Sequence, residues 1–361
     1  LLDFLDTLPE ESPRYQQART ALGDVTHMLY EGVATKAAEA RERLAPLLEQ
    51  EGGDPSLRIS AIGHAHMDLG WLWPIRETKR KGARTFATVL DLMDRYPNYR
   101  FGASQPQYYL WMKENSPVLY GRIKARIAEG RIEPQGAMWV EADTNVSGGE
   151  ALARQLLYGK RFFLEEFDRE INHLWLPDVF GYTAALPQLL QLADVPYFST
   201  QKLSWSLINV FPHHSFRWQG LDGTGVLTHM LPEETYNSPA APRSVRKIEE
   251  NYKESGVSHH SLMIYGIGDG GGGPGMEHLE RLDRIENLAG LSPVTQEPVA
   301  AFFDKWASEA DRFPTWVGEL YLERHEGTLT TEARNKWYNR KMELALRGLE
   351  WTSVLTKALT G

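Results

Sequence analysis

Cysteine is absent from this chain of 361 residues, which excludes a disulfide framework, a thiolate metal site and a cysteine nucleophile. Long apolar runs are also missing, since no stretch approaches the roughly 18 residues that a membrane span needs. The first residues, Leu1 to Glu11, are too acidic for a signal peptide. These absences favour a cytoplasmic location and no membrane partner.

An excess of positive charge is lacking as well. Lysine and arginine number 39 against 48 aspartate and glutamate residues, the net charge is −9, and no basic run occurs. Such a chain repels a phosphate backbone, which argues against nucleic acid as a partner. The 42% hydrophobic and 24% charged residues are ordinary for a globular protein. The chain starts at Leu1 rather than methionine and stops directly after a helical pattern, so we expect a piece of a longer protein.

The order of apolar segments predicts an α/β fold. The first 55 residues read as a helical lead-in, with segments such as 34–49 that are rich in Ala, Glu, Arg and Leu. From residue 58 onward, short apolar strands alternate with amphipathic helices, which is typical of parallel βαβ units. Seven strands are predicted, at 58–63, 99–104, 131–139, 173–178, 197–201, 261–267 and 316–322. Helices are predicted between most of them, at 75–96, 107–129, 150–167 and 276–288.

Two segments depart from this alternation. A β-hairpin is predicted over 215–232, around the turn Leu221-Asp222-Gly223. The segment 331–359 reads as one long helix with no strand after it.

Residues of metal-ligand type are concentrated at the end of the first strand, in Gly63-His64-Ala65-His66-Met67-Asp68. Because side chains alternate along a strand, His64, His66 and Asp68 point to one side if the extended conformation continues. Two imidazoles and a carboxylate aimed at one point indicate a metal site. The alternative is a set of hydrogen-bonded polar residues at a strand end, but packing alone hardly requires three ligand-type residues in five positions.

Single carboxylates follow two later strands. Asp178 ends the segment LWLPD (174–178), and Asp269 follows YGIG (265–268). Reacting groups of α/β folds lie beyond the carboxyl ends of the strands, which makes both residues candidates, although Asp178 could equally be the N-cap of a short helix. The glycines around Asp269 match GxGxxG, but a carboxylate inside a pyrophosphate loop would repel its ligand, so dinucleotide binding is rejected. Glycines that let a ligand approach Asp269 closely are the better explanation.

Aromatic and polar side chains gather near other strand ends. Six residues are candidates for substrate binding: Trp71, Trp139, Glu141, Asp143, Lys202 and His325. Flat aromatic faces beside carboxylates suit sugars, whose C–H faces stack while their hydroxyl groups take hydrogen bonds. The same aromatic residues, with Trp73 and Trp205, could instead fill the rim of the fold, and a single histidine such as His325 is more often a surface residue.

Seven motifs taken in order carry a specific resemblance. They are GHAHMDLGWLWP (63–74), EPQGAMWVEADTNVSGGEAL (133–152), LWLPDVFGYTAALP (174–187), FSTQKLSW (198–205), FPHHSFRWQGLDGTGVLTHMLP (211–232), YGIGDGGGGP (265–274) and GELYLERHEGT (318–328). With these motifs the chain resembles the α-mannosidases of glycoside hydrolase family 38, in their cytosolic or bacterial branch. The resemblance implies a helical lead-in (1–55), a seven-stranded (β/α) catalytic barrel (56–328) and the beginning of a helical domain (329–361).

The resemblance also implies a metal site. His66, Asp68 and Asp178 would ligate a divalent ion, usually zinc, with cobalt or another divalent ion as an alternative. The family's fourth ligand is a histidine of a later motif, which does not occur in this sequence. Either the chain is truncated, and then weakly active or inactive, or His64 or His325 replaces that ligand.

The implied reaction is retaining hydrolysis of terminal α-mannosides of glycans or oligosaccharides. Asp178 would attack the anomeric carbon, a second carboxyl group with Asp269 as the candidate would protonate the leaving oxygen, and Trp71 would stack on the sugar. A barrel-type metal-dependent amide hydrolase is a rival, because it also carries H-x-H on its first strand. Such enzymes need histidines at later strand ends, and the strands at 197–201 and 261–267 end without one. A sugar-binding piece without turnover is a third reading, and a homo-oligomer is left open.

Overall fold

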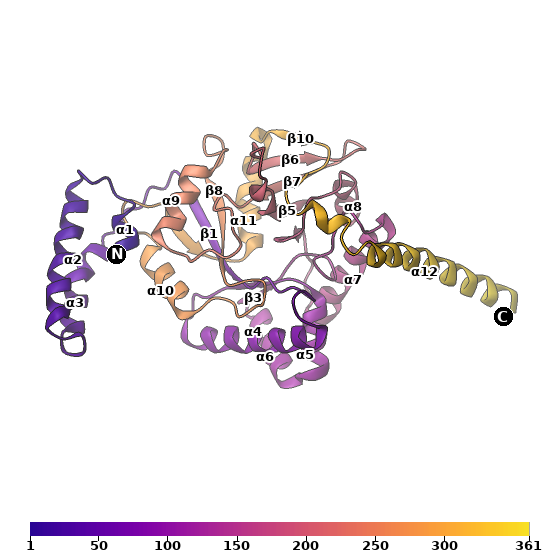
Figure 1. Ribbon diagram of the computed structural model, residues 1–361, viewed down its shortest axis with the longest axis horizontal. Helices are drawn as coiled ribbons and strands as arrows, with labels where there is room; N and C mark the ends of the chain where they lie inside the picture. Colours follow the sequence, from indigo (N-terminus) through magenta and orange to yellow (C-terminus); the bar gives the residue numbers. More distant parts are fainter. Residues whose placement is uncertain (361) are drawn as a thin grey trace. The chain divides into compact units, whose positions relative to one another are not determined.

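The computed structural model describes residues 1–360, which form two compact units that interleave along the chain (Figure 1). Unit 1 consists of Leu1–Gly102, Ser116–Glu133 and Leu231–Arg312, and the described part of unit 2 consists of Ala103–Asn115, Pro134–Met230 and 313–360. Mostly parallel strands alternate with helices in both units, so the predicted α/β class is confirmed.

The sheet of unit 1 is centred on β1 (Arg58–His64). β8 (His260–Gly266) pairs in parallel with β1 over its whole length. Along the other edge of β1 lie β9 (Val294–Gln296) and then β2 (Phe101–Ala103), which β3 (Ile132–Pro134) follows. All but the first residue of β1 and of β8 is buried, as in a parallel sheet covered on both faces. Because these two central strands run in the same direction, the loops after them leave the sheet at the same edge.

The helices of unit 1 are α1 (Leu2–Leu5), α2 (Pro13–Glu31), α3 (Val33–Leu48), α4 (Ile75–Arg95), α6 (Pro117–Ala128), α9 (Pro242–Asn251), α10 (Met276–Ile285) and α11 (Val299–Trp306), the last continued by a 3₁₀ helix at Ala307–Arg312. α2 and α3 pack side by side, as Figure 1 shows, with Ala18, Ala21 and Leu47 buried between them. α4 buries Phe86, Val89, Leu90 and Met93, a spacing that places all four on one helix face.

The sheet of unit 2 has the strand order β10-β6-β7-β5-β4. Its strands are β4 (His173–Trp175), β5 (Tyr197–Thr200), β6 (Ser215–Gln219), β7 (Gly225–Met230) and β10 (Thr315–Val317). β6 and β7 pair in antiparallel fashion, which confirms the predicted hairpin, and the other neighbours are parallel. The helices are α5 (Pro106–Asn115), α7 (Gly149–Phe167), α8 (Leu186–Leu192) and α12 (Ala333–Thr360), with 3₁₀ helices at Lys202–Trp205 and Glu326–Leu329. The predicted terminal segment 329–361 includes Gly361, which lies outside the described residues.

All seven predicted strands occur, but the predicted single barrel of seven strands is not confirmed. Within residues 1–360 the strands form two sheets of five, and neither closes. Three strands end earlier than predicted for local reasons. Gly136 (φ 90°) and Gly318 (φ 105°) leave the extended region after β3 and β10, and Pro177, which cannot donate to a ladder, follows β4.

The helix predicted at 107–129 is two helices. Pro117 has no N–H group and restricts the residue before it, so α5 ends at Asn115 and α6 begins at Pro117. The short elements β9, α8, α9 and α11 were not predicted.

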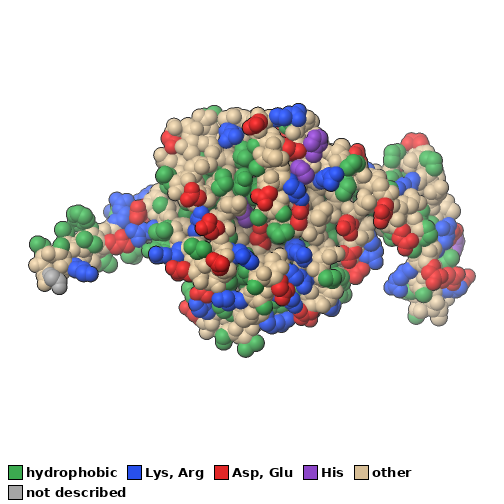
Figure 2. Space-filling model, turned by 180° about the vertical axis from the view of Figure 1, so that it is seen from behind, with side chains coloured by type: hydrophobic (Ala, Val, Ile, Leu, Met, Phe, Trp, Pro, Cys, Tyr) green, Lys and Arg blue, Asp and Glu red, His purple; other side chains and the backbone are tan. Residues whose placement is uncertain are grey.

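The helices and the surface charges are the features that bear on a membrane or nucleic-acid partner. No helix within residues 1–360 combines the length and the apolar character that crossing a membrane requires. On the face shown in Figure 2, acidic and basic side chains are interspersed rather than gathered by sign.

Candidate metal centre and catalytic residues

One histidine and two carboxylates converge on the loops that follow β1 and β8. His66, Asp68 and Asp269 each offer one ligand atom, and these atoms lie within 4.8 Å of one another. His66 Nε2 is 3.5 Å from Asp68 Oδ1. Among residues 1–360, this is the one group of three or more histidine or carboxylate side chains that meets this spacing.

The backbone ties these two loops together. The Asp68 N–H donates to the Asp269 carbonyl oxygen at 3.0 Å, and Met67 pairs with Gly270 in an isolated β-bridge. A glycine is required at the end of β8, because a Cβ on Gly266 would lie 2.2 Å from the His64 carbonyl oxygen. The pairing of β1 with β8 therefore delivers Asp269 to the His66–Asp68 loop.

The donor set fits a divalent ion. Tetrahedral zinc with bonds of about 2.0–2.2 Å places neighbouring donors roughly 3.3–3.6 Å apart, which matches the distance between His66 and Asp68. His66 is buried, whereas Asp68 and Asp269 are partly exposed, so solvent reaches the carboxylates. Imidazole and carboxylate donors suit zinc and neighbouring transition metals better than calcium.

His64 does not belong to this group, contrary to the expectation that it points the same way as His66 and Asp68. β1 ends at His64, so the extended conformation on which that expectation rested does not continue. The buried His64 ring lies instead with Nδ1 3.0 Å from the Gly102 carbonyl oxygen, on the neighbouring strand. His325, the other substitute considered, lies in unit 2.

Asp178 lies in a second group of side chains, within unit 2. Its carboxylate forms an ion pair with the Lys202 ammonium. That ammonium also lies 3.6 Å from the centre of the Trp205 ring and 4.9 Å from that of Phe180. The His325 ring is 4.8 Å from the Phe180 ring, so the structure brings together three predicted residues, Asp178, Lys202 and His325.

The charges of this second group act on the histidine. Partial burial lowers the pKa of His325, and the nearby Lys202 and Arg324 lower it further, while Asp178 opposes the shift. The imidazole is therefore held in its neutral form at neutral pH and is able to accept a hydrogen bond.

Two other predicted polar residues are engaged by their surroundings. Glu141 Oε1 accepts a hydrogen bond from Ser104 Oγ at 2.6 Å. Asp143 Oδ1 accepts from the N–H groups of Asn145 and Val146, at 2.9 and 2.6 Å, and so closes a turn. These bonds engage one of the two carboxylate oxygens of Asp143.

The predicted aromatic platforms lie on different elements. Trp71 is 57% exposed on the loop after β1, with its ring edge-to-face against Trp73 at 5.4 Å. Trp139 donates from Nε1 to Gln107 Oε1 and lines a shallow pocket of about 430 Å³ with Tyr158 of α7. Trp71 is thus exposed to solvent, and Trp139 borders a pocket.

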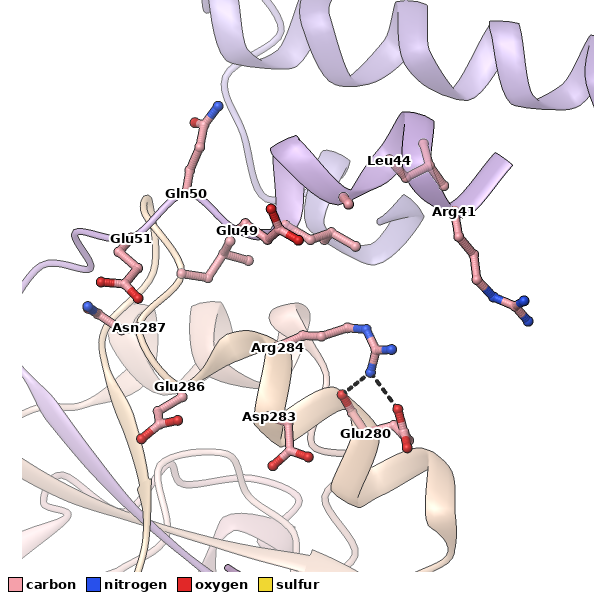
Figure 3. Close-up of a pocket in the computed structure, with 13 residues that line it drawn as sticks. Arg41, Leu44, Glu49, Gln50, Glu51, Glu280, Asp283, Arg284, Glu286 and Asn287 are labelled. Atoms are coloured by element: carbon pink, nitrogen blue, oxygen red, sulfur yellow. Dashed lines mark hydrogen bonds and ion pairs between the residues drawn. The ribbon is translucent and has the colours of Figure 1, made fainter. Parts of the chain in front are cut away.

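A larger cleft of unit 1 lies away from these residues. It measures about 890 Å³ and runs between α3 and α10, as Figure 3 shows. Five carboxylates line it, from Glu49, Glu51, Glu280, Asp283 and Glu286, together with Arg41 and Arg284. Arg284 already pairs with Glu280, and none of the predicted site residues lines this cleft. The candidate site therefore rests on the His66–Asp68–Asp269 cluster rather than on the cleft.

Tyr236 is a residue of the site that the sequence did not reveal. Its hydroxyl donates to Asp269 Oδ1 at 2.9 Å. Nothing in the polar segment PEETYNSP (232–239) distinguishes this tyrosine, and only the fold brings it to Asp269.

Comparison with known families and curated proteins gives concordant matches. The profile of the family described as "Glycosyl hydrolases family 38 N-terminal domain" matches residues 56–319. The chain is similar to alpha-mannosidase 2C1 of Homo sapiens, with 45% identity over 309 residues that cover 86% of this chain and 30% of that protein. It is also similar to alpha-mannosidase G of Dictyostelium discoideum, with 40% identity over 351 residues, 97% of this chain and 32% of that protein. The chain thus spans about a third of the length of these curated relatives.

A solved structure shows the same fold. An alpha-mannosidase from Enterococcus faecalis V583 superimposes with a TM-score of 0.63 and 17% sequence identity, over 73% of this chain and 31% of that chain. At this identity the likeness concerns the fold alone.

Proposed function

Since this chain belongs to glycosyl hydrolase family 38, we propose that it provides the catalytic N-terminal portion of an α-mannosidase. The proposed substrates are terminal α-mannosides of glycans or oligosaccharides. The names of the curated relatives support this activity. The observation that carries it is the clustering of His66, Asp68 and Asp269 within the range that the family profile matches.

The motifs support a finer organisation, which we also propose. It comprises the helical lead-in at 1–55, a seven-stranded catalytic barrel at 56–328 and the beginning of a helical domain at 329–361. A cytoplasmic location and a role in mannose metabolism belong to the same proposal.

In this proposal His66, Asp68 and Asp269 hold a divalent ion, most simply Zn²⁺, with Co²⁺ as the alternative. A bound ion of this kind supplies Lewis acidity that polarises substrate oxygens. The fold itself holds the three ligand residues in place, because the Asp68 N–H donates a hydrogen bond to the Asp269 carbonyl oxygen and the His66 side chain is buried. The family resemblance names Asp178 as a further ligand.

Asp178 is the proposed nucleophile of a retaining mechanism. Its carboxylate oxygen forms a bond to the anomeric carbon as the bond to the leaving oxygen breaks, and water later hydrolyses the covalent glycosyl-enzyme. The contact with Lys202 orients this carboxylate. Trp71 and Trp139 would stack on sugar rings, and Glu141, Asp143 and His325 are the proposed polar contacts.

Asp269 has two proposed roles, and one variant distinguishes them. The resemblance makes it the acid/base, whereas the cluster makes it a metal ligand. If Asp269 is the acid/base, Asp269→Ala keeps its metal, and azide restores turnover of substrates with good leaving groups. If it is a ligand, the variant loses metal, and azide does not restore turnover.

Hydrolysis of an aryl α-mannoside, measured together with metal content by elemental analysis, tests the proposed function. Asp68→Ala is expected to lose metal and turnover together. Asp91→Ala, which removes an exposed carboxylate of α4, is the control and is expected to keep both. Full metal occupancy in Asp68→Ala would contradict the metal assignment. Cleavage of amides but not of mannosides would indicate an amide hydrolase. Binding of mannosides without turnover would indicate a sugar-binding protein.

A fluorinated mannosyl inactivator tests the nucleophile. The wild-type chain is expected to accumulate a covalent adduct that mass spectrometry locates on Asp178, and Asp178→Ala is expected to form none. An adduct on another carboxylate would overturn this assignment.

A further inference from the structure

We propose that Tyr236 is the positioning residue of the metal centre, and that its hydroxyl and ring together set the affinity for the ion. The proposal rests on the proposed function only in taking His66, Asp68 and Asp269 as ligands. Tyr236 itself is not a ligand, because its hydroxyl is directed to a carboxylate.

Tyr236 contacts two of the three proposed ligands. Its hydroxyl donates to Asp269 Oδ1 at 2.9 Å, and its ring packs edge-on against the His66 imidazole, with 5.1 Å between centroids. The side chain is buried, with 4% of its surface exposed. One rigid side chain therefore connects the ligand from the β1 loop with the ligand from the β8 loop.

Asp269 needs such an anchor. It adopts a left-handed backbone conformation (φ 59°), and the four residues that follow it, 270–273, are all glycine. The loop is held through its backbone, for example by Gly272 N–H on Thr85 Oγ1, and these bonds do not fix the side chain of Asp269. A hydrogen bond to one carboxylate oxygen limits the rotation of the group that must meet the ion. Partners that hydrogen-bond a ligating carboxylate typically change metal affinity by about 10–100-fold.

The segment that carries Tyr236 is fixed to the same strand as Asp269. Ser238 N–H donates to the Ile264 carbonyl oxygen at 3.1 Å, and Gly266 N–H donates to the Ser238 carbonyl oxygen at 3.2 Å. The segment of Tyr236 is therefore bonded to β8, and Asp269 follows β8 directly in the chain. Their common attachment to this strand sets the distance between the two side chains.

Tyr236 packs closely against Gly268, and only a residue without a Cβ fits at this position. A Cβ on Gly268 would lie 2.6 Å from Asn237 Oδ1, 2.8 Å from the Tyr236 ring and 3.1 Å from His66 Cβ. The added methyl group of Gly268→Ala would thus displace Asn237, Tyr236 or His66, while every polar side chain of the cluster is still present.

Metal affinity of the 361-residue chain, measured by titration with Zn²⁺ and by the visible absorption of bound Co²⁺, tests the proposal. Tyr236→Phe keeps the ring against His66 and removes the hydroxyl, so Zn²⁺ binding is expected to weaken about 10–100-fold with an altered Co²⁺ spectrum. Gly268→Ala is expected to weaken binding as well. Tyr96→Phe is the matched control, since it removes a phenol that donates to a carboxylate, Glu280, elsewhere in unit 1; its affinity should equal that of the wild type.

The outcomes separate this proposal from the proposed function. If the wild-type chain binds no metal, the ligand assignment fails and this inference fails with it. If the wild type binds metal but Tyr236→Phe and Gly268→Ala bind it within twofold and with the same spectrum, the positioning role alone is overturned. Circular dichroism establishes that each variant is folded, and if Tyr236→Phe does not fold, Gly268→Ala decides the question.

Discussion

A single lysine sets the charge environment of the proposed nucleophile. Lys202 is 2% exposed, and its ammonium is compensated by the Asp178 carboxylate and by the faces of Trp205 and Phe180. A buried ammonium without compensation is costly, and so is a carboxylate that loses its counter-charge. These two groups therefore stabilise the fold only as a pair.

Lys202→Met is expected to lower the free energy of unfolding by roughly 1–3 kcal/mol, because it removes the hydrogen-bond partner of the partly exposed Asp178 carboxylate while keeping the volume of the side chain. The double variant with Asp178→Asn should recover part of the loss. Lys247→Met is the control, since its exposed ion pair with Glu234 contributes about 0–1 kcal/mol. Urea unfolding measures all three, and equal losses in Lys202→Met and Lys247→Met would contradict the account.

His173 predicts a pH dependence of stability. Burial in β4 lowers its pKa from 6.5 to about 4, so the unfolded chain binds the proton more tightly than the folded one. The stability contributed by the neutral imidazole is present above pH 6.5 and is lost as the pH falls through 4, up to roughly 3 kcal/mol. His173→Gln removes this titration. The difference in unfolding free energy between wild type and variant should shrink in acid, and parallel pH profiles would show that His173 does not titrate differently on folding.

At the residue scale, the sequence could predict those site residues that a local pattern marks. His66 and Asp68 alternate after an apolar strand, and the structure places both in one cluster. His64 fitted the same pattern, but its ring meets the adjacent strand, because the alternation holds only while the chain stays extended. No local sequence pattern distinguishes Tyr236, and its contact with Asp269 depends on the pairing of segments that are distant in the sequence.

At the element scale, a glycine decides how α7 packs. Gly159 lies against the loop that carries Trp139, and a Cβ there would lie 2.1 Å from the Ala137 carbonyl oxygen and 2.8 Å from the Trp139 nitrogen. These are backbone atoms, which cannot move aside as a flexible side chain can. The close approach of α7 thus requires glycine.

Gly159→Ala is expected to destabilise unit 2 by roughly 1–3 kcal/mol or more, even though alanine is the better helix former. Gly348→Ala, in α12 of the same unit, is the matched control. No atom lies within 4 Å of its added Cβ, so it should gain about 0.5–1 kcal/mol from helix propensity. Thermal unfolding distinguishes the two, and a stabilised Gly159→Ala would mean that α7 does not pack as described.

Elements were predictable where a long periodic pattern specified them. α4 and α7 follow their predictions within two residues at each end, because their apolar spacing runs over many turns. The ends of β3 and β10 could not be predicted, because the hydrophobic pattern of the sequence does not reveal a positive φ at Gly136 or Gly318. β9 has three residues and α8 has seven, too few for a period to be read.

At the scale of the whole molecule, local patterns specify strands but not their partners. The seven predicted strands all exist, yet they belong to two sheets, and β1 alone pairs with three strands from distant parts of the chain. Which strands pair depends on long-range packing that alternation along the chain does not encode. The parallel pairing of β1 with β8 is what assembles His66, Asp68 and Asp269.

Anomalous diffraction at the zinc absorption edge, from crystals of the chain grown with Zn²⁺, tests the central claim most directly. We predict one strong peak with the His66 imidazole nitrogen and oxygens of Asp68 and Asp269 at about 2.0–2.2 Å. A peak bonded to Asp178 in place of Asp269 would contradict the assignment of the third ligand. A peak that touches neither His66 nor Asp68, or no peak at saturating zinc, would contradict the metal centre itself.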